Sequence, residues 1–172
     1  MKIGAIIQAR MSSTRLPGKV MMTIDGTNTL LYYVITQLQH SKLLDKIIVA
    51  TTNLQEDDII VKFIEKMGIG YFRGNSTDVL DRYYQCAKRF SISKIIRITG
   101  DNPLIDPSIV DQVIHKFESG LYDYVATQPP RTFPQGTDYE VFSFKALERA
   151  WHEAKKPSER EHVTPYFYNH PN

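Results

Sequence analysis

The sequence predicts an α/β fold of three layers, a Rossmann-like arrangement in which helices cover both faces of a mostly parallel sheet. The main observation is an alternation between residues 3 and 127, where short apolar runs and helical patterns follow one another with short joints. Such alternation is typical of right-handed βαβ units. The chain has 172 residues, 42% of them hydrophobic and 23% charged, which are ordinary values for one folded domain.

The first elements follow from the apolar pattern. Residues 3–7 (IGAII) predict a buried strand, and residues 29–39 place Leu, Val and Ile at helical spacing. A second β-branched run, residues 46–52, predicts the next strand. The helix predicted over residues 56–68 begins with acidic residues and ends at a glycine, as the helix dipole and the C-cap favour. Residues 68–73 predict a short third strand.

The alternation continues through the middle of the chain. The helix predicted over residues 76–90 begins with a Ser or Thr cap, and residues 94–100 predict the fourth strand. The helix predicted over residues 106–120 has a proline near its start and a glycine at its end. Residues 123–127 predict another strand.

The pattern changes after residue 127. Residues 128–143 predict a loop followed by an extended segment, and residues 144–156 and 158–170 predict two helices. The chain shows no internal repeat, linker or low-complexity tract. We therefore expect one α/β domain with an irregular C-terminal third.

Composition excludes several classes of protein. A net charge of +2 is too small for general nucleic-acid binding. Cys86 is the only cysteine, so no disulfide can form within the chain, which favours a reducing compartment. No apolar run approaches the ~18 residues that a membrane span needs, and the N-terminus lacks a signal-peptide layout. We expect a cytoplasmic protein with no nucleic-acid or membrane partner.

The loop QARMSSTRLPGKV, residues 8–20, follows the first predicted strand. Open parallel sheets bind ligands at the carboxyl ends of their strands. Arg10, Arg15 and Lys19 can neutralise an anion there, and the turn at Gly18 lets the backbone approach it closely. From the residues alone, this loop is either a polyphosphate site or a solvated surface turn.

Carboxylates follow two other predicted strands or extended segments. Asp101 comes directly after residues 94–100, where it could hold Mg²⁺ together with phosphate oxygens or could simply cap a turn. Asp138 and Glu140 stand two residues apart, so an extended backbone places them on one face. That pair could complete a metal site, bind a substrate, or form an exposed acidic face. Arg160 could bind a substrate carboxylate or pair with surface charges.

Five stretches, in order along the chain, resemble the cytidylyltransferases that make CMP-activated sugar acids. They are QARMSSTRLPGKV (8–20), RGNSTDVLDRYY (73–84), RITGDNPLIDP (97–107), GTDYEVFS (136–143) and SEREHVTPYF (158–167). The match is closest to the spore-coat polysaccharide branch, which is related to the acylneuraminate and Kdo cytidylyltransferases. The resemblance implies the fold of nucleotide-diphospho-sugar transferases. It also implies a nucleotidyltransferase domain over residues 1–172 that lacks C-terminal elements of the family.

The implied reaction is CTP + sugar acid → CMP-sugar + pyrophosphate, a nucleotidyl transfer (EC 2.7.7) in surface polysaccharide synthesis with Mg²⁺ as cofactor. By resemblance, the nucleotide-binding residues are Ala9, Arg10, Arg15, Lys19, Arg73 and Thr77. Lys19 and Asp101 are the implied catalytic residues, Asp101 and Asp138 the metal ligands, and Glu140 and Arg160 the substrate contacts. For Arg73 an exposed charge, and for Thr77 helix capping, remain alternatives.

Other functions stay open at this stage. The same architecture serves nucleotidyltransferases that use another nucleoside triphosphate, glycosyltransferase-like proteins, and nucleotide-binding modules without activity. A homodimer through the C-terminal third is also open, because the related sugar-acid enzymes dimerise there.

Overall fold

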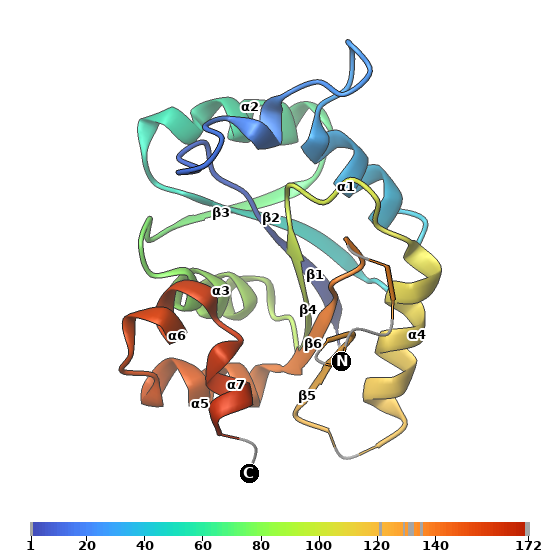
Figure 1. The fold of residues 1–172 in the computed structure, drawn as a ribbon, viewed down its shortest axis with the longest axis vertical. Helices are drawn as coiled ribbons and strands as arrows, with labels where there is room; N and C mark the ends of the chain where they lie inside the picture. The colour runs from blue at the N-terminus through green and yellow to red at the C-terminus, as the bar shows by residue number, and fades with distance from the viewer. Residues whose placement is uncertain (1, 121, 129, 131–132, 135, 171–172) are drawn as a thin grey trace.

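The computed structural model describes residues 2–120, 122–128, 130, 133–134 and 136–170, which form a six-stranded sheet between two layers of helices (Figure 1). The strands are β1 (Ile3–Gln8), β2 (Lys46–Thr52), β3 (Gly70–Gly74), β4 (Lys94–Thr99), β5 (Tyr124–Ala126) and β6 (Glu140–Ser143). The helices are α1 (Leu30–Leu38), α2 (Asp58–Lys66), α3 (Val79–Phe90), α4 (Pro107–Glu118), α5 (Phe144–Glu153), α6 (Pro157–His162) and α7 (Pro165–Asn169). Two short 3₁₀ helices, η1 (Lys19–Met21) and η2 (Gln55–Asp57), precede α1 and α2. The predicted three-layer α/β fold is confirmed.

The sheet has the strand order β3-β2-β1-β4-β6-β5. Strands β1 to β4 pair in parallel, as the βαβ pattern predicts. Strand β6 is antiparallel to both β4 and β5 and lies between them. The extended segment expected within residues 128–143 is therefore an inserted strand, and it moves β5 to the edge of the sheet. Residues 129, 131–132 and 135 of the predicted loop lie outside the described residues.

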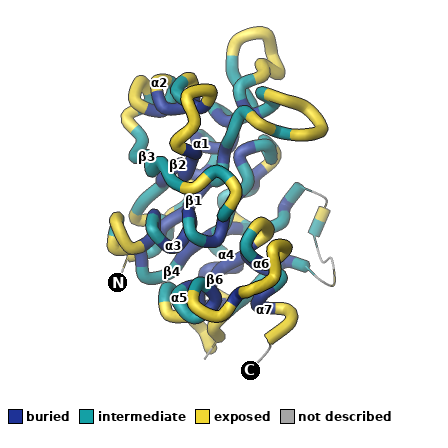
Figure 2. The backbone as a smooth tube through the Cα atoms, turned by 90° about the vertical axis from the view of Figure 1, so that its left-hand side faces the viewer, coloured by how far each residue is buried: buried dark blue, intermediate teal, exposed yellow. Residues whose placement is uncertain are grey.

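Each face of the sheet has its own apolar core. The central strands between the two cores are largely buried (Figure 2). Successive side chains of β1 alternate between these cores, as the pleat of a strand requires. Ala5 and Ile7 pack with α1, α2 and α4, whereas Ile6 packs with α3, α5 and α7. The parallel pairing of β1 with β2 and β4 brings the loop that follows β1 to the carboxyl edge of the sheet.

The C-terminal helices differ from the prediction. The helix expected over residues 158–170 is two helices, α6 and α7, separated at Val163, whose φ is +68°. Pro165 contributes to the break, because a proline lacks the N–H that a continuous helix would donate to the carbonyl four residues earlier. The preceding helix, α5, is predicted to reach Lys156 but ends at Glu153, because the next residue, Ala154, has an extended ψ of 115°.

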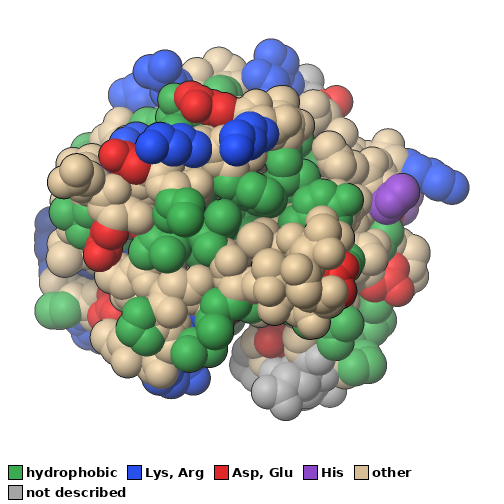
Figure 3. Space-filling view, turned by 90° about the horizontal axis from the view of Figure 1, so that it is seen from above, with side chains coloured by type: hydrophobic (Ala, Val, Ile, Leu, Met, Phe, Trp, Pro, Cys, Tyr) green, Lys and Arg blue, Asp and Glu red, His purple; other side chains and the backbone are tan. Residues whose placement is uncertain are grey.

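The upper face of the molecule carries apolar side chains between basic ones (Figure 3). Two elements at the top of Figure 1, the loop before α1 and helix α2, expose Ile24 and Ile59 by 54% and 49%. In the part of the chain that the structure describes, every helix is too short or too polar to cross a membrane.

Candidate active site

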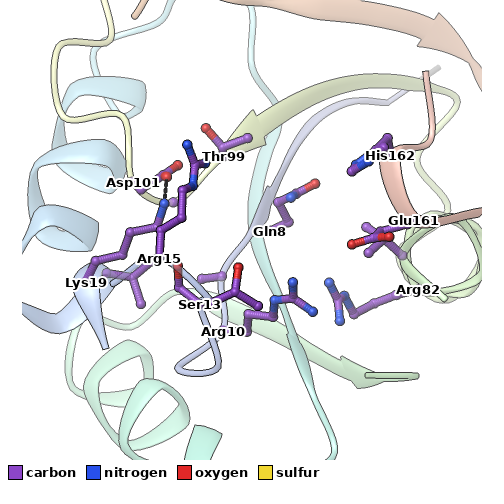
Figure 4. A pocket seen from close by; sticks show the side chains of 15 residues that line it. Gln8, Arg10, Ser13, Arg15, Lys19, Arg82, Thr99, Asp101, Glu161 and His162 are labelled. Atoms are coloured by element: carbon purple, nitrogen blue, oxygen red, sulfur yellow. Dashed lines mark hydrogen bonds and ion pairs between the residues drawn. The ribbon is translucent and has the colours of Figure 1, made fainter. Parts of the chain in front are cut away.

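The carboxyl ends of β1 and β4 open into a cavity of about 330 Å³. Its walls come from the loop after β1, the first turn of α3, the end of β4, and the end of α6. Lys19 and Asp101 lie on one side of this cavity, and Arg82 and Glu161 lie on the other (Figure 4). The cavity therefore lies at the edge of the sheet where parallel strands bind their ligands.

The loop after β1 is closed by hydrogen bonds of its own backbone. Gly18 has a φ of +72°, which glycine adopts without strain, and its N–H donates to the Met11 carbonyl at 2.7 Å. The Met11 N–H donates to Asp57 Oδ1 at 2.7 Å. Asp57 is fully buried, and its other oxygen accepts from the N–H and hydroxyl of Thr52 at the end of β2. Asp57 is not among the predicted site residues, yet it fixes the loop to the sheet.

Lys19 and Asp101 connect two walls of the cavity. Lys19 begins η1, and its Nζ forms an ion pair with Oδ2 of Asp101, which follows β4 (Figure 4). Their side chains are 22% and 31% exposed, so water screens the pair only in part. Burial opposes the charge on Asp101, but hydrogen bonds from Lys19 and Thr99 hold the pKa of its carboxyl below the usual value. The carboxylate is therefore ionised at neutral pH.

The donor set at this end fits a divalent metal that binds together with phosphate groups. Asp101 presents a partly exposed carboxylate to the cavity. Asp138, the second predicted metal ligand, comes two residues before β6, is partly buried and does not line this cavity. Within the described residues, no group of three His, Cys, Asp or Glu side chains forms a self-contained metal site. Mg²⁺ typically needs only one or two carboxylates when phosphates supply further oxygens.

A second cationic group lies across the cavity. Arg10 follows β1 and Arg82 comes from the first turn of α3, and their guanidinium groups point toward one another (Figure 4). Arg82 is only 1% exposed, and its Nη1 donates to the Asn75 carbonyl at 2.9 Å. Burial lowers the pKa of the Arg82 guanidinium, and the charge on Arg10 lowers it further. Arg82 lies within the stretch RGNSTDVLDRYY that carries the family resemblance, but it is not among the predicted site residues.

Two further residues predicted to bind the nucleotide also line the cavity. Ala9 is 3% exposed, and its N–H donates to the Ala50 carbonyl at 3.2 Å. Arg15 is exposed at the rim of the cavity. The structure therefore brings together Ala9, Arg10, Arg15, Lys19 and Asp101.

Arg73 and Thr77 do not line this cavity. Arg73 pairs with Asp58 at 2.6 Å and donates to two backbone carbonyls within residues 52–54, at 2.8 and 3.0 Å. Thr77 is exposed, and its N–H and hydroxyl donate to Asn75 Oδ1 at 2.9 and 3.1 Å in the turn before α3. The Arg73 contacts therefore organise the turn after β2, and the Thr77 contacts organise the segment between β3 and α3.

Glu140 lies in a buried polar cluster outside the cavity. Its side chain is 9% exposed and forms an ion pair with Arg97 of β4. One Glu140 oxygen also accepts from the hydroxyls of Tyr124 and Tyr168, each at 2.8 Å. These contacts connect β4, β5, β6 and α7, and they occupy the carboxylate predicted to contact substrate.

Arg160 lies beside the cavity and not in it. Its Nε donates to Asp78 Oδ2 at 2.8 Å, and its Nη1 donates to the Trp151 carbonyl at 2.7 Å. Because Asp78 is the N-cap of α3, this pair connects α6 to the start of α3. The next residues of α6, Glu161 and His162, line the cavity in its place.

Comparison with known proteins gives the family of this chain. The family model described as Cytidylyltransferase matches residues 4–172. The uncharacterized protein MJ1063 of Methanocaldococcus jannaschii is 45% identical over 172 residues, which are 100% of this chain and 69% of that protein. The spore coat polysaccharide biosynthesis protein SpsF of Bacillus subtilis is 38% identical, over 96% of this chain and 70% of its own.

Solved structures agree with this match. A cytidylyltransferase from Leptospira borgpetersenii superposes with a TM-score of 0.94 at 38% identity, over 99% of this chain and 72% of that one. A CMP:2-keto-3-deoxy-manno-octonic acid synthetase complexed with CTP has a TM-score of 0.76 at 16% identity, over 98% and 86% of the two chains, and so shares the fold. The 3-deoxy-manno-octulosonate cytidylyltransferase of Geobacter sulfurreducens is 34% identical over 66% of this chain and 44% of its own.

Proposed function

This chain belongs to the cytidylyltransferase family of nucleotidyltransferases, and from this premise we propose that it transfers CMP from CTP to a sugar acid and releases pyrophosphate. The observation that carries the proposal is the Lys19–Asp101 pair, which sets a cation and a carboxylate together beside the loop after β1. Nucleotidyl transfer needs charge neutralisation on phosphates and a means of holding them in line with the acceptor.

In the proposed reaction, an acceptor hydroxyl oxygen bonds to the α-phosphorus of CTP, and the bond from that phosphorus to pyrophosphate breaks. Negative charge then builds on the departing pyrophosphate. Lys19 and Arg15, both on the loop after β1, would neutralise this charge. Asp57 acts indirectly, because its hydrogen bond to Met11 holds the loop in place before the nucleotide binds.

Asp101, together with Asp138, would hold Mg²⁺, which supplies positive charge to the phosphate oxygens when bound. Lys19 neutralises Asp101 in the present arrangement. A bound nucleotide offers Lys19 phosphate oxygens as alternative partners. We therefore expect nucleotide and metal to bind with positive cooperativity, because each provides a partner for one member of the ion pair.

A sugar acid is the proposed acceptor because of the relatives. The Geobacter sulfurreducens protein is a 3-deoxy-manno-octulosonate cytidylyltransferase, and the Bacillus subtilis relative is a spore coat polysaccharide biosynthesis protein. The first name supports a sugar acid as the acceptor, and the second supports a product used in polysaccharide synthesis. The particular sugar acid is left to experiment.

The proposal is tested by measuring pyrophosphate release from CTP, UTP, GTP and ATP. Each nucleotide is offered with 3-deoxy-manno-octulosonate or an acylneuraminate, in Mg²⁺ and in chelator. We expect release from CTP alone, dependent on an acceptor and a divalent metal. Lys19→Ala should weaken CTP affinity by about 10- to 100-fold, the range of a charge-assisted contact. Lys62→Ala, on exposed α2 surface, serves as the charge-matched control.

Three results would contradict the proposal. Turnover with another nucleotide in preference to CTP would change the base assignment. CTP binding without turnover on any acceptor of the panel would indicate a nucleotide-binding module. Unchanged CTP affinity in Lys19→Ala would exclude the loop after β1 from phosphate binding.

A further inference from the structure

The cavity holds a second positively charged group for which the proposed roles of Lys19 and Asp101 give no account. Arg82 is 1% exposed and lines the cavity, and its guanidinium points toward that of Arg10 (Figure 4). A guanidinium has five N–H donors. Arg82 makes one hydrogen bond, to the Asn75 carbonyl, while its buried Nε has no hydrogen-bond partner.

Within the described residues, neither Arg10 nor Arg82 forms an ion pair with a carboxylate. Asp57 and Asp78 act on Arg82 only at longer range. Glu161 faces the same cavity from α6 but is exposed and forms no ion pair with either arginine there. Arg10 itself makes one long hydrogen bond, 3.4 Å from Nη1 to the Ser76 carbonyl.

Arg97, whose side chain is 16% exposed, shows how this fold compensates a largely buried guanidinium group. Arg97 also has a buried Nε without a hydrogen-bond partner, but its Nη1 forms an ion pair with Glu140. Arg82 has no such partner and faces a second cation instead. Isolated buried charges are costly unless a counter-charge or hydrogen bonds offset the loss of water. A cavity that places two guanidinium groups face to face therefore suits a negatively charged ligand.

We propose that Arg10 and Arg82 form an oxyanion subsite, in which the two guanidinium groups hold one phosphate or carboxylate group of a substrate. Guanidinium groups bind such planar or tetrahedral oxyanions through two parallel N–H donors. The subsite rests on the proposed function only for the identity of the ligand, because both substrates of that reaction carry oxyanions: CTP its phosphates, and the sugar acid its carboxylate.

The test is a calorimetric titration of wild type, Arg82→Gln and Arg82→Lys with four probes. Pyrophosphate and CTP carry phosphate, 3-deoxy-manno-octulosonate carries a carboxylate, and cytidine carries the base without an anion. Arg89→Gln is the matched control, because Arg89 lies on the same helix, is exposed, and changes the net charge equally. The melting temperature of each variant, measured without ligand, checks the fold.

We expect Arg82→Gln to lower the affinity for the oxyanion that occupies the subsite by about 10- to 100-fold, as for the loss of a charge-assisted hydrogen bond. Arg82→Lys keeps the charge but loses the two parallel N–H donors of the guanidinium group. Its affinity should therefore lie between those of Arg82→Gln and wild type. A loss of affinity for pyrophosphate and CTP would show that the subsite holds a phosphate group. A loss of affinity for 3-deoxy-manno-octulosonate would show that it holds the carboxylate. The affinity of Arg82→Gln for cytidine should equal that of wild type. Arg89→Gln should bind all four probes with wild-type affinity.

Two outcomes would overturn the subsite. The first is wild-type affinity of Arg82→Gln for all three anions. The second is equal loss for cytidine and CTP, which would make Arg82 a contact of the base. If Arg82→Gln does not fold, Arg82→Lys decides on the same criteria. A failure of the proposed function is distinct, because wild type would then not bind CTP while its pyrophosphate affinity would still respond to Arg82.

Discussion

Both ends of the cavity carry cationic side chains, but in the described part of the chain a carboxylate pairs with the cation at only one of them. At one end Lys19 is neutralised by Asp101, and the pair connects the loop after β1 to the end of β4. At the other end Arg82 faces Arg10, and neither has a carboxylate within ion-pair distance among the described residues. The first end keeps its arrangement through protein contacts alone. The second end is stabilised by whatever anion enters it.

This difference separates two ways in which a fold prepares a charged site. A neutralised cation costs little to hold, but the ligand must displace its partner. A pair of like charges without a counter-charge costs stability before binding, and an anion that binds the folded state offsets that cost. Substitutions should therefore differ in effect: Asp101→Asn should change turnover, whereas Lys19→Ala and Arg82→Gln, which each remove a cation, should change affinity.

The largest expected effect is at the neutralised end. Asp101→Asn keeps the size of the side chain but removes the charge, so we expect turnover to fall by about 10³-fold, a loss of several kcal/mol of transition-state stabilisation. The measurement is kcat for pyrophosphate release, with the melting temperature as a check of the fold. Asp111→Asn, at a carboxylate of α4 that binds Ser41 far from the cavity, is the matched control. An active Asp101→Asn enzyme would exclude Asp101 as the metal ligand.

The sequence predicts most of the fold because local patterns govern it. Strands β1, β2 and β4 are short runs rich in isoleucine and other β-branched residues, and Asp106 caps α4 where that helix is predicted to begin. The cap of α3 is Asp78 and not the predicted Ser or Thr. The position of β6 cannot be read this way. Its four residues pair with β4 and β5, which are distant in the sequence, so their place in the sheet is decided by tertiary packing.

The site divides in the same manner. Arg10, Arg15, Lys19 and Asp101 follow strands, and the rule for parallel sheets brings them together. Glu140 shows the limit of that reasoning, because its spacing from Asp138 says nothing of the Arg97 partner that occupies it. Arg82 is a site residue that the prediction missed. It is a charged residue on a buried helix face, three residues after Val79 and four before Cys86, both of which are buried.

The Arg97–Glu140 pair offers a way to measure what a buried arginine such as Arg82 costs when it lacks a counter-charge. Glu140→Gln would leave the largely buried Arg97 without a counter-charge, a condition close to that of the fully buried Arg82. We expect the free energy of unfolding to fall by about 3 kcal/mol, since removal of one partner leaves an uncompensated buried charge. Urea denaturation measures this change, and Glu118→Gln, at the partly exposed Lys94–Glu118 pair, is the control.

The same variant separates two roles for Glu140. Because its carboxylate is occupied by Arg97, Tyr124 and Tyr168, we expect the acceptor KM of Glu140→Gln to match wild type below the melting temperature. A raised KM with unchanged stability would instead assign Glu140 to the substrate. A neutral effect on unfolding would show that this fold tolerates an unpaired buried arginine, and the contrast between the two ends of the cavity would then carry no energetic meaning.

The smallest expected effect is at Arg73, which the family resemblance assigns to the base and the structure assigns to the turn after β2. Arg73 pairs with Asp58, whose side chain is 44% exposed, and an exposed ion pair of this kind contributes about 0–1 kcal/mol. Arg73→Gln should therefore leave CTP affinity within about twofold of wild type, since that surface contribution acts on the loop and not on the ligand. Calorimetry with CTP and with UTP measures both affinity and base discrimination. A tenfold loss for CTP but not for UTP would place the base at the end of β3, and cytosine would then be read outside the cavity that Arg10 and Arg82 share.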